Sequence, residues 1–368
     1  MKGNILVLTN SITGLHTFRK EVMKAIVEAR FQLYISAPGS ENDCVQYFKE
    51  IGCKIIKTNL KRRGMNPIAD FKLMLNYRRI VKRLKPIAVL SYTIKPNIYG
   101  GMACRLCGVP QLANVTGLGD AIENGGWLQK LTTMLYTIGI GKARQIFFQN
   151  ATNRNFFIRI GIADERSIQL PGSGVNLLHH VYQGYPEDGI TKFLYISRVI
   201  KDKGAGEFLE MAEIIKAKYP KTEFQIVGWI GDDYKDRVDD LVNKGILSFL
   251  GSTSDVRPYL KRAHCTILPS YHEGMSNVNL ESAANGRPVI TTNVPGCRET
   301  VEDGVTGFLV EPRSTQSLAD AVERFINLPF EQKVLMGKEG RRKVEREFDR
   351  QIVVDAYLNE IEKIYKPV

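Results

Sequence analysis

The sequence predicts an α/β protein of two domains, each built on a doubly wound parallel sheet. The chain has 368 residues, which is enough for two domains of ordinary size. Short apolar runs rich in β-branched residues alternate with segments of helical spacing along the first half, and the second half repeats this plan. Such alternation indicates parallel strands joined by helical crossovers.

In the first half, strands are predicted where short apolar runs end in polar or glycine-bearing loops. A segment with helical spacing through Phe18, Val22 and Ile26 follows the first run, and Pro38-Gly39 ends the second. Another helix is expected to begin within residues 149–152, after the last strand of this half. The strands are expected at residues 4–9, 31–36, 53–57, 87–91, 112–115 and 146–149.

The second half is predicted to follow a linker that contains Gly184, Pro186 and Gly189. Its strands are expected at residues 192–197, 224–227, 247–250, 265–268, 288–292 and 308–310, and helical patterns fill residues 316–327 and 330–366. The predicted divisions are residues 1–180 for the first domain, 181–190 for the linker, 191–350 for the second domain and 351–368 for a C-terminal helix.

Composition predicts a globular, cytoplasmic protein. Hydrophobic residues make up 43% of the chain and the mean hydropathy is -0.17, which are ordinary values for a globular protein. No apolar run approaches the roughly 18 residues that cross a bilayer, and the amino terminus resembles a first strand rather than a signal peptide. Cys104 and Cys107 are the single close cysteine pair, so a zinc site would lack its second pair.

The positive charge is concentrated in the first half. Residues 1–188 hold 25 Lys+Arg against 12 Asp+Glu, whereas the remainder holds 26 against 27. Residues 57–85 carry ten basic side chains and one acid, Asp70, interleaved with apolar residues such as Phe71 and Leu75. This pattern favours an anionic membrane surface. A solvated basic face is the alternative, and nucleic acid is disfavoured because no usual recognition module is found.

A strand–loop–helix–strand unit over residues 264–310 carries the strongest chemical pattern. Backbone N–H groups of residues 274–278, in the loop and the first helical turn, suit a phosphate. Glu273 and Glu281 bracket this segment, and each carboxylate could accept hydrogen bonds from two adjacent sugar hydroxyls. The pattern suits a ligand with sugar at both ends and phosphate in the middle, although an isolated pair of acids could also be solvated surface residues.

Two cations stand at a comparable position earlier in the second half. Arg198 and Lys203 lie on the loop between the strand at residues 192–197 and the helix that follows it. Two cations beside a helix amino terminus would clamp a diphosphate and stabilise the charge that develops on it as a leaving group. A structural salt bridge is the alternative.

Three loops of the first half carry acceptor or phosphate candidates. The first loop lacks the G-x-G-x-x-G dinucleotide fingerprint, so a nicotinamide cofactor is disfavoured, but Gly14 would let backbone approach a phosphate. Lys95 lies on a loop that opens a helix, and Thr116, Gly117 and Asp120 lie on a glycine-rich loop after another strand. Asp120 could orient an acceptor hydroxyl or cap a helix.

The stretch from Glu273 to Ile290 resembles the signature of the retaining family 4 glycosyltransferases. That signature sets a pair of glutamates within the pattern E-G-x-x-x-x-x-L-E-A-x-A-x-G-x-P-V-I. The sequence departs from it at Ser282, where alanine is usual, and at Ser276, where proline is frequent. The resemblance extends over nearly the whole chain and is strongest over residues 192–311.

This resemblance implies the GT-B architecture, in which two Rossmann-like domains face each other across a cleft and the last helix crosses back to the first domain. It implies catalytic roles for Arg198, Lys203 and Glu273. Together with the loop analysis it gives the donor-binding set as Gly14, Ser252, Thr253, Gly274, Met275, Ser276, Asn277, Val278 and Glu281. The acceptor-side candidates are Lys95, Thr116, Gly117 and Asp120, with Thr116 standing where many family members have a histidine.

The reaction implied by the resemblance is transfer of a sugar from a nucleoside diphosphate with retention at the anomeric carbon. No covalent nucleophile is expected, because the acceptor hydroxyl attacks on the leaving group's own face. The chain contains no Asp-x-Asp, and hard divalent cations need converging oxygen ligands. We therefore predict metal-independent chemistry with no cofactor, in which a UDP-sugar is the donor substrate.

The segments at residues 91–100 and 117–119 resemble a bacterial subgroup that builds capsule, O-antigen and other surface polysaccharides. Members of that subgroup extend polyprenyl-diphosphate-linked saccharides from UDP-hexoses, including UDP-N-acetylgalactosamine. The resemblance and the basic first half together predict a peripheral enzyme on the inner face of the cytoplasmic membrane, with the basic N-terminal domain against anionic lipid.

Three alternatives stay open at this point. A soluble retaining glycosyltransferase with a small acceptor would share every donor-site motif, and only the basic first half speaks against it. A UDP-sugar 2-epimerase of the same architecture is disfavoured by the cations at 198 and 203 and the acids at 273 and 281. A non-enzymatic basic scaffold would make that constellation coincidental.

Overall fold

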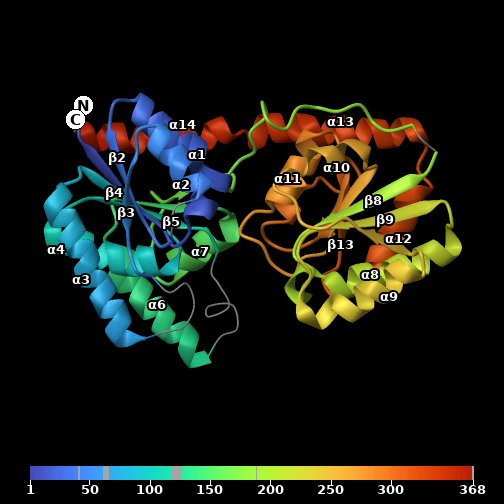
Figure 1. The fold of residues 1–368 in the computed structure, drawn as a ribbon, viewed down its shortest axis with the longest axis horizontal. Coiled ribbons are helices and arrows are strands. Elements are labelled where there is room, and N and C mark those ends of the chain that lie inside the picture. The colour runs from blue at the N-terminus through green and yellow to red at the C-terminus, as the bar shows by residue number, and fades with distance from the viewer. Residues whose placement is uncertain (40–41, 61–65, 118–125, 188, 367–368) are drawn as a thin grey trace. The chain divides into compact units, whose positions relative to one another are not determined.

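The computed structural model describes residues 1–39, 42–60, 66–117, 126–187 and 189–366 (Figure 1). The chain divides into two compact units. The first unit comprises Met1–Ser173 and Gln351–Val368, and the second comprises Gly174–Arg350. No helix in the described part of the chain is both long enough and apolar enough to span a bilayer.

Seven parallel strands form the sheet of the first unit. They are β1 (Asn4–Leu8), β2 (Gln32–Ala37), β3 (Lys54–Lys57), β4 (Ala88–Tyr92), β5 (Gln111–Val115), β6 (Gln145–Phe148) and β7 (Ile168–Gln169). Their order is β3-β2-β1-β4-β5-β6-β7, so the chain winds outwards from β1 in both directions. The predicted doubly wound parallel sheet is confirmed. β7 was not predicted, because two residues are too few to show a hydrophobic period.

Helices cover both faces of this sheet. They are α1 (Ile12–Glu28), α2 (Asp43–Glu50), α3 (Pro67–Leu84), the π-helix η1 (Pro96–Gly100), α4 (Gly101–Cys107), α6 (Gly126–Ile140), α7 (Ala151–Arg159) and α14 (Arg350–Tyr365). Alternate strand residues enter two cores: Ile5 and Val7 pack with α1, α2 and α14, whereas Leu6 and Leu8 pack on the face of α3 and α4. Figure 1 shows α1 and α14 on one side and α3 and α6 on the other.

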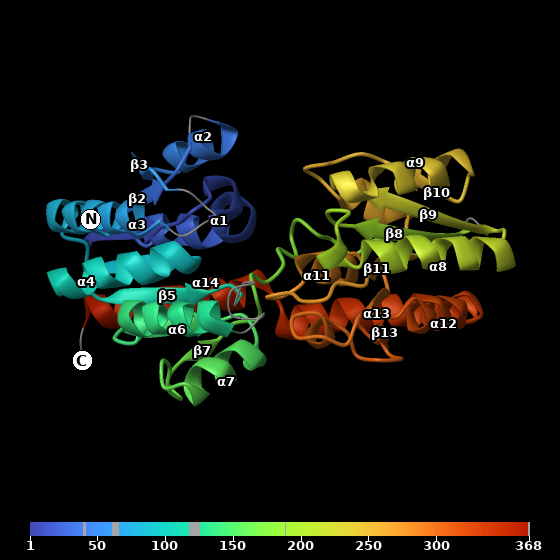
Figure 2. The same cartoon turned by 90° about the horizontal axis from the view of Figure 1, so that it is seen from below.

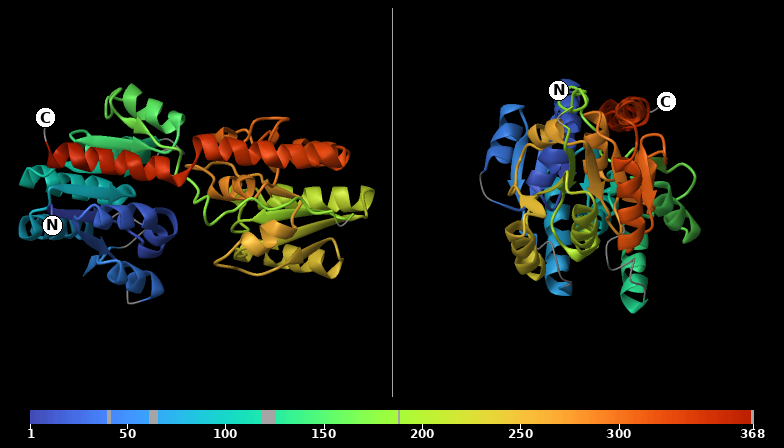
Figure 3. Two further views of the ribbon diagram at one scale, coloured as in Figure 1. Left: turned by 90° about the horizontal axis from the view of Figure 1, so that it is seen from above. Right: turned by 90° about the vertical axis from the view of Figure 1, so that its right-hand side faces the viewer.

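The C-terminal helix α14 completes the core of the first unit. Val353, Tyr357 and Ile361 are fully buried in the same cluster as residues of β1, β2 and α1. The Tyr357 hydroxyl donates to the side-chain oxygen of Asn114, at the end of β5. The left-hand view of Figure 3 shows α14 lying across this sheet.

Helix α14 is separate from α13 (Phe330–Glu347), although helical spacing continues through residues 330–366. The Val175 N–H donates to Phe348 O at 2.8 Å, and the Arg350 N–H donates to Val175 O at 3.1 Å. These bonds take backbone groups that a continuous helix would use. The spacing of apolar side chains could not reveal this, because the partner segment is distant in the sequence.

The segment that follows Ser173 packs on the second unit. The Gln183 N–H donates to Asn285 O, and the fully buried Arg287 donates to Gly184 O at 2.8 Å and to Leu260 O at 2.7 Å. The residues predicted as the end of the first domain and as a linker therefore belong to the second unit. Their glycine and proline content mimics a linker, but buried arginine bonds hold their backbone.

Six parallel strands form the sheet of the second unit, in the order β10-β9-β8-β11-β12-β13. The strands are β8 (Thr191–Ile196), β9 (Thr222–Val227), β10 (Leu247–Phe249), β11 (Cys265–Leu268), β12 (Val289–Thr292) and β13 (Gly307–Val310). The helices are η2 (Lys201–Lys203), α8 (Ala205–Lys218), η3 (Asp232–Tyr234), α9 (Lys235–Asn243), α10 (Arg257–Arg262), α11 (Asn277–Ala284), η4 (Arg298–Thr300), α12 (Thr315–Ile326) and α13. Residues of α8, α9 and α12 share one core, and residues of α11 and α13 share another.

The strand order of the second unit brings two distant loops together. β8 pairs with β11, with Cys265 opposite Phe193, so the loops after both strands leave the same edge of the sheet. Gly204 ends η2 with a φ of +66°, and a Cβ at this position would lie 2.0 Å from Pro269 O, at the end of β11. The two loops therefore approach as closely as backbone allows, and glycine is required where they meet.

We expect Gly204→Ala to lower the unfolding free energy by about 1–3 kcal/mol, because it adds both a backbone clash and an unfavourable positive φ. Gly206, in the first turn of α8, is the matched control: its nearest atom would be the Tyr234 hydroxyl, at 3.7 Å. Gly206→Ala should raise stability by about 0.5–1 kcal/mol. Urea unfolding of both variants measures this, and equal effects would contradict the close approach.

Candidate active site

The loops after β8 and β11 place opposite charges against each other. The Lys203 ammonium lies 2.5 Å from the Glu273 carboxylate, although the two residues are 70 positions apart in the sequence. Their side chains are 15% and 19% exposed, so the pair is shielded but reachable from solvent. Two of the three residues with predicted catalytic roles are thus in direct contact.

A buried tyrosine contacts the backbone of the loop that follows β8, which is called the β8 loop below. The Tyr195 hydroxyl lies 3.1 Å from both Arg198 O and Lys203 O, and burial raises the pKa of this phenol well above its ordinary value. The Tyr195 hydroxyl therefore holds the backbone at both residues that carry the cations, Arg198 and Lys203. The Arg198 side chain is exposed, whereas Lys203 is turned towards Glu273.

The loop that follows β11, called the β11 loop below, is hydrogen-bonded to the β8 loop and to helix α8. The Tyr271 N–H donates to Asp202 O at 2.9 Å, and the Tyr271 hydroxyl donates to the Glu207 carboxylate at 2.6 Å. The Arg313 guanidinium lies 4.8 Å from the centre of the Tyr271 ring. These supporting residues could not be predicted from the sequence, because their partners come from three separate elements.

Helix α11 begins beside this loop with Ser276 as its N-cap. The Ser276 hydroxyl accepts from the Asn279 N–H at 3.3 Å, and the Ser276 N–H donates to Gly296 O at 2.7 Å. Met275 is buried in the core. Of the predicted phosphate-binding N–H groups, that of Ser276 is therefore engaged within the protein, and those of Asn277 and Val278 lie in the first turn, where N–H groups lack intrahelical partners.

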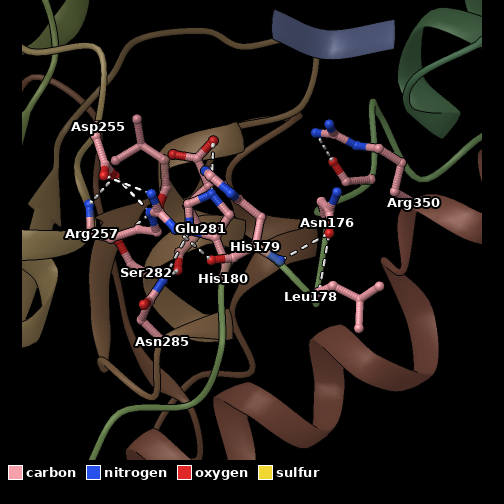
Figure 4. A network of polar contacts seen from close by, with 12 residues as sticks. Asn176, Leu178, His179, His180, Asp255, Arg257, Glu281, Ser282, Asn285 and Arg350 are labelled. Atoms are coloured by element: carbon pink, nitrogen blue, oxygen red, sulfur yellow. Dashed lines mark hydrogen bonds and ion pairs between the residues drawn. The ribbon is translucent and has the colours of Figure 1, made fainter. Parts of the chain in front are cut away.

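Glu281 lies within α11 in a polar cluster with histidines and an ion pair (Figure 4). Its carboxylate is 4.0 Å from His180 Nε2, and His180 Nδ1 is 3.0 Å from the Asn285 amide nitrogen. Burial raises the pKa of Glu281 to about 7; Arg350 acts in the opposite direction, and Asp255 adds to the rise. Burial also lowers the pKa of His180 to about 4, so this histidine is neutral near pH 7.

His180 and Asn285 are site residues that the sequence analysis missed. The amide nitrogen of Asn285 also donates to Glu281 O at 2.7 Å, so it leaves His180 Nδ1 to act as an acceptor. Nε2 then carries the proton on the side of Glu281. The adjacent histidines at 179 and 180 were the available signal, but nothing in their spacing indicated a partner in α11.

Ser252 and Thr253 lie on an exposed loop after β10 that leads to the same cluster. The Thr253 hydroxyl accepts from the Asp255 N–H at 3.0 Å, and Asp255 forms an ion pair with Arg257 at 2.7 Å. The Gly228 N–H donates to Gly251 O, which joins this loop to the one after β9. The predicted nucleotide-reading loop is thus connected by hydrogen bonds to the cluster that surrounds Glu281.

The remaining predicted site residues belong to the first unit. Gly14 lies in the first turn of α1 rather than in a loop, because Ser11 caps the helix and its hydroxyl accepts from the Gly14 N–H at 3.0 Å. Thr116 and Gly117 follow β5 and are partly exposed. Asp120 lies outside the described residues.

Lys95 is held in a structural ion pair. Its ammonium lies 2.8 Å from the buried carboxylate of Asp70, which also accepts from the Tyr99 hydroxyl at 3.2 Å. The Lys95 side chain is 15% exposed. Its charge is therefore already compensated by Asp70, the single acid of the basic stretch.

Within the described ranges, no three His, Cys, Asp or Glu side chains lie close enough to hold a metal ion. All six cysteines are free thiols, and Cys104 is buried in the core beside α3.

Two units with Rossmann-like parallel sheets are typical of the GT-B glycosyltransferases. Residues 190–327 match the sequence model of the glycosyl transferases group 1, and residues 5–150 match that of the glycosyl transferase 4-like domain. The chain therefore belongs to the glycosyltransferases that combine a 4-like domain with a group 1 domain.

Two named relatives align with most of the chain. The chain is 24% identical to the N,N'-diacetylbacillosaminyl-diphospho-undecaprenol alpha-1,3-N-acetylgalactosaminyltransferase of Campylobacter jejuni, over 98% of this chain and 99% of that protein. It is 27% identical to the UDP-Gal:alpha-D-GlcNAc-diphosphoundecaprenol alpha-1,3-galactosyltransferase of Escherichia coli, over 78% of each chain. The structure of Anabaena HepE in complex with UDP-glucose has the same fold, with a TM-score of 0.78, 16% identity, and coverage of 98% of this chain and 99% of that one.

The raised pKa of Glu281 has a consequence for stability. Its pKa is about 7 in the folded protein against 4.5 ordinarily, so the folded state binds the proton more tightly and stability falls as pH rises between these values. We expect Glu281→Gln, which stays neutral, to stabilise the protein by about 2–3 kcal/mol at pH 8 relative to wild type. The difference should vanish towards pH 4.

Urea unfolding at intervals from pH 4 to pH 8 measures this difference. Glu302→Gln, at an exposed position, is the matched control and should leave the pH dependence of the wild type in place. A difference between Glu281→Gln and wild type that is constant with pH would contradict a raised pKa at Glu281.

Proposed function

We propose that this glycosyltransferase moves a hexose or N-acetylhexosamine from a UDP-sugar to a polyprenyl-diphosphate-linked saccharide, with retention and without a metal ion. The contact between Lys203 and Glu273 carries the proposal, because it sets a cation for a diphosphate beside a carboxylate for a sugar. The two named relatives support the acceptor class, since both are transferases named for diphospho-undecaprenol-linked sugars.

The leaving diphosphate is the group that needs stabilisation. As the bond from the anomeric carbon to the diphosphate oxygen breaks, negative charge grows on that oxygen. Lys203, the exposed Arg198 and the N–H groups at the start of α11 supply positive charge to it. Because no divalent cation is invoked, these groups carry the whole of the charge neutralisation.

Retention follows from attack on the same face as the leaving group. The acceptor hydroxyl forms the new bond to the anomeric carbon, and its proton passes to the diphosphate oxygen that departs. Glu273 holds the Lys203 ammonium through one oxygen and has further acceptor capacity for a hydroxyl of the transferred sugar. No enzyme nucleophile takes part.

The nucleoside end of the donor is assigned to Glu281 and the β10 loop. In this proposal Glu281 accepts hydrogen bonds from the ribose hydroxyls, and backbone groups of Ser252 and Thr253 read the base. Burial raises the pKa of Glu281, and hydrogen bonds from two ribose hydroxyls would favour its charged form.

The proposed acceptor class also supports a location at a membrane. A polyprenyl-linked saccharide is anchored in the bilayer, and the first unit carries the excess of basic residues. We propose peripheral attachment to the cytoplasmic face of the cytoplasmic membrane, with an anionic lipid surface as the partner of this unit.

The direct test is an activity assay with a panel of UDP-, GDP-, ADP- and dTDP-sugars, a short-chain polyprenyl-diphosphate-linked saccharide and EDTA. We expect transfer from one UDP-sugar that EDTA does not reduce, and an α-linked product from an α-linked donor in the proton NMR spectrum. An inverted product would overturn the proposed retention, and loss of activity with EDTA would overturn the proposed metal independence. Transfer to free monosaccharides alone would instead favour a soluble acceptor, and loss of the sugar's 2-configuration would favour an epimerase.

Replacing Lys203 tests the diphosphate role. We expect Lys203→Ala to lower kcat by about 100–1000-fold, the cost of removing one charge-stabilising donor. Lys201→Ala is the matched control, because Lys201 lies on the same turn with an exposed side chain, and it should leave kcat unchanged. A kcat for Lys203→Ala within about threefold of wild type would remove Lys203 from the mechanism.

A further inference from the structure

Helix α3 exposes apolar side chains on the face away from the sheet. Leu73 and Tyr77 are buried in the core. Ile68, Phe71 and Leu75, which are 70%, 58% and 38% exposed, follow one stripe of the same helix with spacings of three and four residues. The first half of α3 is therefore apolar on its outer side as well as on its inner side.

The neighbouring helices continue this feature. On α6, Trp127, Met134 and Ile138 are 71%, 52% and 39% exposed and are spaced at about two turns and one turn along the helix. On α4, Leu106 is 58% exposed. Figure 2 shows α3, α4 and α6 side by side across one face of the sheet, and α4 contacts both of the others. We call the exposed side chains of these helices the three-helix face.

The charge on the three-helix face is of one sign. The three helices contain one acid, Asp70, which is buried and paired with Lys95. The exposed basic side chains are Lys72, Arg79, Lys82, Arg83, Arg105 and Lys130. Exposed apolar groups and cations are therefore mixed on these three helices, none of which carries an exposed carboxylate.

Another surface helix shows that this mixture is not general. On α8, Ile214 is 47% exposed, but Glu210 and Glu213 lie on the same helix near it. Single exposed apolar residues of that kind are normal on protein surfaces. The three-helix face instead has seven exposed apolar residues among six exposed cations. This pattern is typical of surfaces that lie in an anionic lipid interface.

We propose that the three-helix face docks on an anionic phospholipid bilayer and inserts Phe71, Trp127 and Met134 at the boundary of head groups and acyl chains. The flanking lysines and arginines then meet the lipid phosphates. This inference rests on the proposed membrane-linked acceptor and goes beyond the basic stretch at residues 57–85. It adds α4 and α6 to the contact, and it makes apolar insertion part of the binding. Nucleic acid would leave the apolar side chains without a partner.

The two tryptophans of the chain provide a direct readout. Trp229→Phe leaves Trp127 as the single fluorophore. With vesicles of phosphatidylglycerol and phosphatidylcholine, we expect a blue shift of its emission and quenching by lipids brominated on the acyl chains. Vesicles of phosphatidylcholine alone should give neither. The reverse variant, Trp127→Phe, should show no change with either vesicle. An unchanged Trp127 emission would overturn the proposal.

Flotation tests the face as a whole. We expect Phe71→Ser combined with Met134→Ser, and separately Lys72→Glu combined with Lys130→Glu, each to lower partitioning onto the anionic vesicles by about tenfold or more. Ile214→Ser on α8 is the matched control and should bind as wild type does. Wild-type partitioning by both double variants would also overturn the proposal.

Two further measurements separate the alternatives. UDP-sugar binding, measured by calorimetry on every variant, reports an intact second unit. If the protein binds the UDP-sugar but does not bind the anionic vesicles, the docking surface alone is overturned. If it binds neither the UDP-sugar nor the vesicles, the result counts against the proposed function as well. A doubled molar mass in light scattering that falls to the monomer in Phe71→Ser with Met134→Ser would assign the face to a second copy of the chain and overturn the bilayer.

Discussion

The close approach of Gly204 to the carbonyl of Pro269 is the constraint on which the candidate site depends. With a Cβ at 204 only 2.0 Å from that oxygen, the loops after β8 and β11 can meet only because this residue is a glycine. The Tyr195 hydroxyl then fixes two carbonyls of the β8 loop, and Asp202 O accepts from the β11 loop. These backbone contacts therefore position the two loops from which Lys203 and Glu273 meet.

A pair of this kind is well suited to a diphosphate sugar. A partly shielded ion pair of modest exposure interacts more strongly than one in bulk water, and its geometry does not have to be assembled when a ligand arrives. The exposed Arg198 differs from Lys203 in this respect, because its long side chain forms no ion pair with a carboxylate of the described residues. In the proposed mechanism, Lys203 therefore provides fixed charge, and the exposed Arg198 provides charge that can follow the departing group.

The sequence predicted the sheets and the motif residues, because both depend on local patterns. Periodicity located the central strands to within a residue or so, and the spacing of Glu273 and Glu281 pointed to the β11 loop. Local sequence patterns could not predict the contact of Lys95 with Asp70 or that of His180 with Asn285, because these contacts join distant elements. The break at Phe348 and the packing of residues 181–187 depend in the same way on Val175 and Arg287, whose partners no local pattern reveals.

Arg350 connects the electrostatics of Glu281 to the place where the chain leaves the second unit. It is the last residue of that unit, its guanidinium donates to Gly174 O at 3.0 Å, and its charge opposes the rise that burial causes in the pKa of Glu281. Gly174 is the first residue of the same unit. The first and last residues of the second unit are therefore joined by the same guanidinium that acts on the carboxylate that we assign to the ribose.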